Sequence, residues 1–291
     1  MADDGYYGVA LLSHEGKQKA YSAENVQAAV DDAVEGDTIF FSYGHFKDIV
    51  LNKKVYLQSV ESDRALKVYL QLPDNTTLES SLFIGHRYAV WVRCNLKSIY
   101  LSGFGGDLYT NESYKIGTVT LDRCYMDISF NYVNVDYLYA NNCVLNNIHG
   151  GNSTKTVSKF KNCNFFVYNL ELANATFENC ILFYNNDEGN ITIDNCSFTR
   201  CLYDPDRFLF GENAKLSDNY EMSQSEWDIS NENLEAKGFL GTDYTIVGTF
   251  GGSTPFEGLV PKDMPKISKL GGYVKVQGKT VIGSWYMNPT W

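Results

Sequence analysis

The strongest constraint on this chain is an internal repeat whose copies end in cysteine. Successive cysteines of the repeat are 19, 20, 17 and 16 residues apart. In every copy the residue three before the cysteine is apolar, the residue two before is polar, and the residue two after is apolar again. The cysteines are Cys124, Cys143, Cys163, Cys180 and Cys196, and the apolar residues three before them are Leu121, Ala140, Phe160, Phe177 and Ile193. Matched copies in one register indicate a stacked, repetitive fold.

Each repeat unit is too small to bury its apolar residues alone, but a stack of units can bury them continuously. Units of this length, with strand alternation on both sides of a turn, predict an all-β, single-stranded, right-handed parallel β-helix. Like residues then form columns. We expect an internal cysteine column, opened one or two coils earlier by Cys94. We also expect an asparagine ladder at the turns, because asparagine tolerates the left-handed conformation. The ladder residues are Asn142, Asn162, Asn179 and Asn195.

The two ends of such a stack need covers. Residues 22–34 have the apolar spacing of a helix, with Ser22 as its expected N-cap and Gly36 as its stop. This predicts a single domain made of a first strand and capping helix (1–36), β-helix coils (37–205), and an irregular C-terminal wrap (206–291) that ends in a β-hairpin near 272–286.

The opening of the chain resembles a known superfamily. Residues 26–46 read VQAAVDDAVEGDTIFFSYGHF, a helix followed by Gly-Asp-Thr-Ile, an apolar strand and a glycine turn. This run is similar to the start of pectin-lyase-like right-handed parallel β-helix proteins. Residues 247–267 resemble the ends of uncharacterised secreted or surface-attached β-helix proteins of Gram-negative bacteria. The resemblance implies an extracellular, periplasmic or outer-surface location, with the signal sequence removed.

The catalytic motifs of the enzymes in that superfamily are absent. A His-Gly pair occurs at His149, but Asp-Asp pairs occur only at residues 3–4 and 31–32, outside the repeats. The paired carboxylates of an inverting glycosidase are therefore not recognisable, and we interpret His149 as a turn residue. The Trp-Ile-Asp-His motif of pectate lyases and the Gln-Asp and Asp-Phe motifs of pectin methylesterases are also missing. Whether the protein is an enzyme stays open at this point.

No metal or cofactor site is expected from the cysteines. Their spacings do not match CxxC, and no histidine lies near them, so buried packing is the better interpretation. The formal net charge of −11 disfavours nucleic acid as a partner, because phosphate binding needs a basic surface. No apolar run is long enough to cross a bilayer. A polysaccharide is the partner we expect.

The repeat register predicts where a ligand would bind. The outward positions two before each cysteine are Asp122, Asn141, Lys161, Glu178 and Asp194, and those four before it are Thr120, Tyr139, Lys159, Thr176 and Thr192. Together they bring Tyr139, Lys159, Lys161 and Glu178 onto one face, where tyrosine offers a flat surface to a sugar ring and lysine offers charge to a uronate or sulfate. The alternative is cross-strand charge pairing that serves only solubility.

These observations favour an extracellular carbohydrate-binding or surface-structural β-helix protein without a recognisable catalytic site. A polysaccharide lyase or glycoside hydrolase that acts on an acidic glycan is the alternative.

Overall fold

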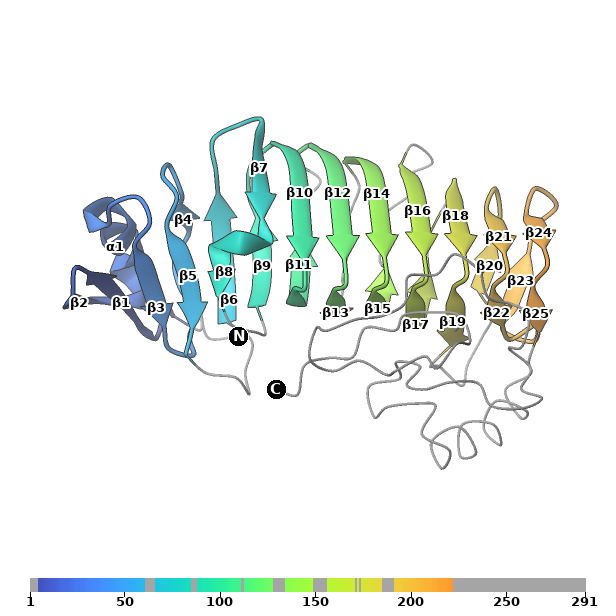
Figure 1. The fold of residues 1–291 in the computed structure, drawn as a ribbon, viewed down its shortest axis with the longest axis horizontal. Coiled ribbons are helices and arrows are strands. Elements are labelled where there is room, and N and C mark those ends of the chain that lie inside the picture. Colours follow the sequence, from blue (N-terminus) through green and yellow to red (C-terminus); the bar gives the residue numbers. More distant parts are fainter. Residues whose placement is uncertain are drawn as a thin grey trace, which may run out of the picture.

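The computed structural model describes residues 5–60, 66–84, 88–110, 113–127, 134–148, 156–170, 172, 174–184 and 191–221. Three sequence predictions lie outside these residues: the turn at His149, the terminal hairpin near 272–286, and the C-terminal wrap beyond residue 221. Within the described residues the chain is a parallel β-helix, as the repeat predicted. Figure 1 shows its coils as a row of parallel strands along the long axis of the molecule.

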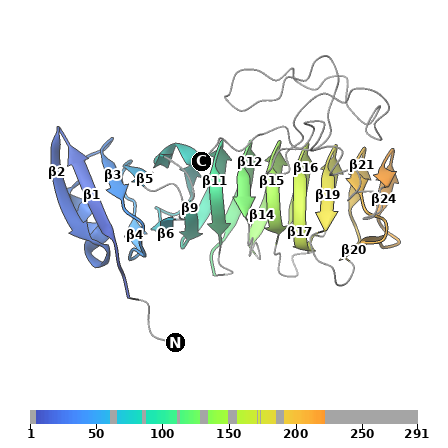
Figure 2. The same ribbon diagram turned by 90° about the horizontal axis from the view of Figure 1, so that it is seen from below.

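Two long parallel sheets form the sides of the β-helix. The eight-stranded sheet contains β7 (Thr76–Glu79), β10 (Leu96–Ser102), β12 (Ile116–Asp122), β14 (Val135–Asn141), β16 (Val157–Lys161), β18 (Ala175–Glu178), β21 (Ser197–Thr199) and β24 (Lys215–Ser217). The ten-stranded sheet contains β4 (Ile49–Val50), β6 (Leu66–Gln71), β9 (Tyr88–Val92), β11 (Gly105–Tyr109), β13 (Tyr125–Asp127), β15 (Val144–Ile148), β17 (Asn164–Leu170), β19 (Ile181–Tyr184), β22 (Leu202–Tyr203) and β25 (Tyr220–Glu221). Figure 2 shows strands of both sheets from below.

Two smaller sheets and three short helices complete the described part of the chain. A five-stranded sheet near the N-terminus contains β2 (Lys17–Ser22), β1 (Val9–His14), β3 (Thr38–Phe41), β5 (Tyr56–Ser59) and β8 (Phe83–Ile84), and a pair on the third side of the later coils contains β20 (Ile191–Ile193) and β23 (Phe208–Phe210). The helices are the 3-10 helices η1 (Ala23–Asn25) and η2 (Ser80–Leu82) and the α-helix α1 (Val26–Asp32).

The interior of the β-helix is built from in-register columns of apolar side chains. Because side chains alternate along a strand, every second residue of each coil points inward, and parallel pairing places it above its counterpart in the previous coil. In the central column the rings of Phe160 and Phe177 stack at 5.0 Å, and those of Phe177 and Phe198 at 4.5 Å. The column runs through Leu101, Leu121, Ala140, Phe160, Phe177 and Phe198, all buried.

One corner of the coils is a ladder of residues in the left-handed conformation. At this corner Asn162 has a φ of 53°. Its backbone N–H donates to the backbone carbonyl of Glu178 in the next coil at 2.9 Å. The side chain of Asn179 donates to Oδ1 of Asn162 at 3.3 Å. The seven corner residues with positive φ are Gly103, Arg123, Asn142, Asn162, Asn179, Arg200 and Asp218. Asn142, Asn162 and Asn179 therefore share one corner, while arginine, glycine and aspartate fill the other coils.

The fifth predicted repeat is out of register and needs correction. Strand β18 pairs with β21 so that Phe177 lies beside Phe198. Residues 191–196 instead lie on β20 and the corner that follows it. The central column, the ladder and the cysteine column therefore continue through Phe198, Arg200 and Cys201, and not through Ile193, Asn195 and Cys196. Likewise Ser197 and Thr199, and not Thr192 and Asp194, extend the two outward rows.

The displaced residues have their own structural places. Asn195 also has a positive φ of 54°, but it precedes β21, at a corner it shares with Asn174. The buried thiol of Cys196 points to the carbonyl of Leu172 at 3.7 Å. Cys94 does not open the cysteine column: it precedes β10, and its sulfur accepts the Leu72 amide at 3.2 Å. The phenyl side chain of Phe104 occupies the place one coil before Cys124, because Gly103 is the ladder residue of that coil.

The N-terminal end is covered by the β1–β2 hairpin, which is antiparallel, together with α1. Val26, Ala29 and Val30 of α1 are fully buried, as their spacing predicted. The helix is shorter than the predicted 22–34, because η1 precedes it and the chain becomes extended at Ala33. Ser22 precedes η1, and its side chain makes no capping hydrogen bond. At the other end, parallel coils continue through β24 and β25 to Glu221, beyond the predicted limit at 205.

Candidate functional site

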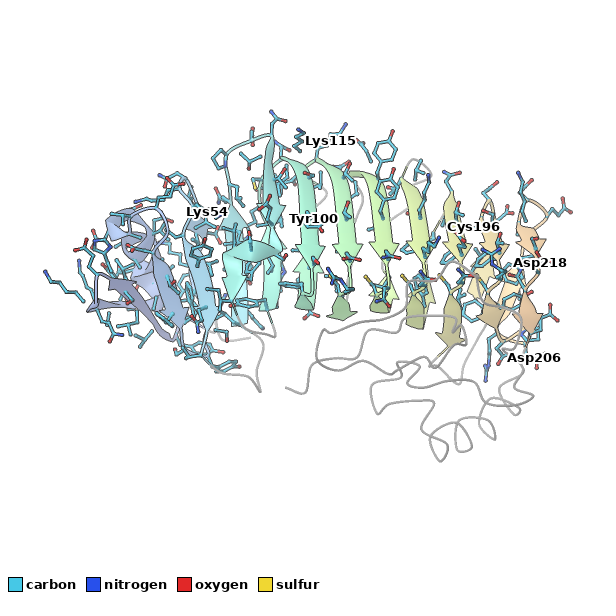
Figure 3. All side chains as sticks on the ribbon, viewed as in Figure 1. Lys54, Tyr100, Lys115, Cys196, Asp206 and Asp218 are labelled. Carbon is cyan, nitrogen blue, oxygen red and sulfur yellow. The ribbon has the colours of Figure 1, made fainter. Side chains whose placement is uncertain are left out.

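The candidate site lies on the outer face of the eight-stranded sheet. Parallel pairing brings the outward residues of each strand into rows that run along the β-helix axis. The row four residues before each cysteine-column position contains Tyr100, Thr120, Tyr139, Lys159, Thr176, Ser197 and Lys215, and the row two before contains Ser102, Asp122, Asn141, Lys161, Glu178, Thr199 and Ser217. Tyr100 lies on β10 in Figure 3.

The four predicted ligand-binding residues occupy three adjacent strands of this face. Tyr139 is on β14, Lys159 and Lys161 are on β16, and Glu178 is on β18. The Lys159 ammonium lies over the Tyr139 ring, 5.8 Å from its centroid. The Lys161 ammonium is 3.6 Å from Oε1 of Glu178. The geometry therefore joins the four residues in two pairs, one cation–aromatic and one ionic.

Arg200 is a functional candidate that the sequence reasoning missed. Its guanidinium donates to Oε1 of Glu178 at 2.7 Å and to Oδ1 of Asn179 at 3.0 Å. The signal was present, because Phe198 and Cys201 have the same spacing as Phe177 and Cys180, but the Asn before Cys196 favoured the other register. Arg200 and Lys161 therefore both pair with the carboxylate of Glu178.

Three cationic side chains and one carboxylate lie on neighbouring coils here, in a protein whose formal net charge is −11: Lys159, Lys161 and Arg200 with Glu178. Two coils before Lys161 in the same row, the carboxylate of Asp122 is already bound by Arg123 at 2.9 Å and by the side-chain amide of Asn141 at 3.1 Å. The carboxylates of Asp122 and Glu178 are thus each paired with neighbouring donors. An anionic ligand that reaches Lys159 meets a cation whose described contact is an aromatic ring and not a carboxylate.

Tyr100 and Tyr137 are two further residues of this face that the prediction did not include. They are 45% and 46% exposed, respectively. Tyr137 lies beside Tyr139 on β14, with ring centroids 6.2 Å apart and planes 20° apart. Counting outward positions further back from Cys143 would have found Tyr137, since it lies six residues before that cysteine.

A second aromatic group lies on the outer face of the ten-stranded sheet. The rings of Tyr69 and Trp91 stack at 4.9 Å, and those of Trp91 and Tyr109 at 4.3 Å with planes only 9° apart. Arg93 adds its guanidinium over Tyr69 at 4.2 Å and binds Asp48 through two hydrogen bonds of 2.8 Å. Since these ring faces are turned toward one another, they leave mainly ring edges for a ligand.

The cysteine column has the properties of packing and not of chemistry. All seven cysteines are free and buried. Burial raises the pKa of the Cys124 and Cys180 thiols well above the ordinary value, so these thiols stay protonated and are poor nucleophiles. In the part of the chain that the structure describes, no group of three or more His, Cys, Asp or Glu side chains could hold a metal ion.

Comparisons with protein-family models, with curated proteins and with solved structures found no match to this chain. The fold is compatible with a parallel β-helix superfamily, and in general with a surface or carbohydrate-related protein. No helix among the described residues is long and apolar enough to cross a membrane.

Proposed function

We propose that this protein is a carbohydrate-binding β-helix that takes an acidic glycan on the outer face of its eight-stranded sheet. The observation that carries the proposal is the Lys159 ammonium over the Tyr139 ring, 5.8 Å from its centroid, on the coils next to Lys161 and Arg200. A tyrosine ring offers an apolar face to a sugar ring, and an adjacent ammonium offers charge to a carboxylate or sulfate.

The spacing of the coils supports this function. Parallel strands repeat every 4.8 Å or so, which is close to the length of one sugar unit. Tyr139, Lys159 and Glu178 lie on three successive strands, so an aromatic ring and charged groups lie within about two sugar lengths of one another on this face. Lys161 is held by Glu178, which leaves Lys159 as the principal charge for the ligand.

The proposal includes a location outside the cytoplasm: extracellular, periplasmic or attached to the outer surface. It is supported by the resemblance of residues 26–46 to pectin-lyase-like β-helix proteins, a membership that also remains a proposal. Fractionation of cells that express the full-length gene, with detection of the protein by antibody, tests the location. Recovery in the cytoplasmic fraction alone would contradict it.

Calorimetric titration with a short oligouronate tests the binding function. We expect the parent protein to bind, and Lys159→Ala and Tyr139→Ala to bind at least several-fold more weakly. Lys161→Ala should have a smaller effect, because Glu178 already occupies its charge. The matched control is Lys67→Ala, an exposed lysine on β6 of the other long sheet, which should bind like the parent. Equal binding by the parent and all these variants would place the site elsewhere.

The same titration samples test the enzymatic alternative. A lyase would convert the oligouronate to unsaturated products that absorb in the ultraviolet, and a hydrolase would release new reducing ends. Binding without either product supports the non-enzymatic function. No binding of any acidic glycan would favour a surface-structural role.

A further inference from the structure

The orientation of two neighbouring tyrosines on β14 constrains how a glycan can lie on this face. Lys159, one coil further along, sits over the face of the Tyr139 ring. The normal of that ring therefore points along the β-helix axis, across the strands. The Tyr137 ring is within 20° of parallel to it, with its centroid 6.2 Å away along the same strand. The two rings form one aromatic wall, with one face toward β16 and the other toward β12.

The strand on the other side of this wall, β12, carries threonine beside the two tyrosines and, at its end, Asp122, whose carboxylate is bound by Arg123 and Asn141. Tyr137 and Tyr139 pair with Thr118 and Thr120 of β12. One coil further, Thr120 pairs with Tyr100 of β10, whose ring is 45% exposed. Tyr100 and Tyr139 are therefore two coil rises apart, about 9.6 Å, with threonine between them.

This separation suits one sugar ring between two aromatic side chains. A ring placed midway lies about 4.8 Å from each strand position, within the range of about 4.5–7 Å at which ring faces attract. Two aromatic rings in direct contact would need about half that separation, so Tyr100 and Tyr139 cannot stack on each other.

The hydroxyl groups around this position are available to a ligand. Within the described part of the chain, four side chains make no hydrogen bond: those of Tyr100, Thr118, Thr120 and Tyr137. Hydroxyls both donate and accept, which is the chemistry needed to bind the hydroxyls of a sugar. An aromatic wall, a second aromatic residue opposite and a threonine floor form the parts of a sugar subsite.

We propose that the glycan crosses the coils, following β12 between Tyr100 and the Tyr137–Tyr139 wall, with a sugar ring stacked over Thr120. This inference rests on the proposed glycan-binding function and specifies its direction. The Lys159 ammonium, on the opposite face of the wall, adds positive charge across the Tyr139 ring, which favours a uronic-acid glycan over a neutral one. A chain laid along the axis would instead have to pass over the protruding Tyr139 ring.

A matched pair of tryptophan substitutions distinguishes the two directions. Thr120→Trp fills the space between the tyrosines, whereas Thr176→Trp places the same side chain in the same outward row on β18. For a glycan that crosses the coils, Thr120→Trp should weaken binding of a short oligouronate more than tenfold, and Thr176→Trp should leave it unchanged. Thr120→Ser keeps the space open and should bind like the parent.

A second measurement separates stacking from charge. The carboxyl-reduced, neutral form of the same oligosaccharide should bind more weakly than the oligouronate, and Tyr100→Ala and Tyr137→Ala should weaken both probes by roughly three- to tenfold. Thermal unfolding of each variant checks that the fold is kept.

The possible failures are distinguishable. If the oligouronate binds and Lys159→Ala weakens it, but Thr120→Trp binds like the parent or Thr176→Trp blocks binding, the crossing direction is overturned and the glycan-binding function stands. If the parent binds neither probe, both proposals fail.

Discussion

Asn162 offers a direct test of what holds the coils in register. It is buried in the corner ladder with a φ of 53°, and it makes two side-chain hydrogen bonds, to Asn141 at 3.4 Å and from Asn179 at 3.3 Å. Asn162→Ala removes both bonds and places a residue without local hydrogen bonding in the left-handed region. The lost bonds cost about 1 kcal/mol each and the backbone strain about 1 kcal/mol more. We expect a loss of about 3 kcal/mol in the free energy of unfolding.

Asn162→Gly separates the two contributions. Glycine adopts the left-handed conformation without strain but makes no side-chain bonds, so its expected loss is about 2 kcal/mol. The control is Glu15→Gly in the β1–β2 turn, where an exposed residue has a φ of 48° outside the ladder. Here relief of strain should stabilise the protein by up to about 1 kcal/mol.

Urea unfolding followed by circular dichroism measures these changes as shifts of the midpoint at constant slope. Equal losses for Asn162→Ala and Asn162→Gly would refute the backbone part of the reasoning. Losses below about 1 kcal/mol for both would show that the ladder bonds contribute little.

Three further predictions concern the core, the thiols and the N-terminal cap. Phe177→Ala should destabilise the fold by about 3–5 kcal/mol and Phe177→Leu by far less, since the ring is buried between two others; similar losses in urea unfolding would argue against the stack. A thiol reagent such as Ellman's should detect almost no reactive cysteine in the native protein and all seven in denaturant; fast native reaction would contradict the buried column. The hydrogen bond to Asp37 raises the pKa of His14 above 6.5. Burial by itself would raise the pKa of Asp37, but the hydrogen bonds from Val34 and His14 outweigh it, so the pKa of Asp37 is lowered from 3.8. The pair should therefore stabilise the protein most between about pH 4 and 6.5. Above this window the stabilisation by His14 is lost as pH rises through its folded pKa, and below it the stabilisation by Asp37 is lost as pH falls. A His14→Gln variant whose melting temperature differs from that of the parent by the same amount at every pH would contradict this.

The candidate site shows how far residue spacing can carry a functional prediction. Tyr139, Lys159, Lys161 and Glu178 were brought to one face by counting back from the cysteines, and the structure places all four on adjacent strands. Which of them touch was not predictable, because side-chain pairing depends on rotamers and on neighbours from other coils. Arg200 reaches Glu178 across one coil, over 22 residues of sequence.

The sequence by itself determined the architecture of the coils. Alternating apolar residues before each cysteine specify an inward-facing strand, and asparagine before cysteine specifies a left-handed corner. The N-terminal helix was likewise encoded locally, in the spacing of Val26, Ala29 and Val30. These features are short-range, so each copy of the repeat carries them independently.

Only the tertiary structure decided which copy pairs with which. Residues 191–196 and 197–201 both offer an apolar residue three before a cysteine, and local pattern alone favoured Asn195 and Cys196. A parallel coil must complete every side before it returns to the same sheet. Residues 191–193 form β20 on a third side and pair with β23, so β18 is met by β21. Strand pairing is a property of the whole coil, and it places Phe198 and Cys201 where the repeat by itself predicted Ile193 and Cys196.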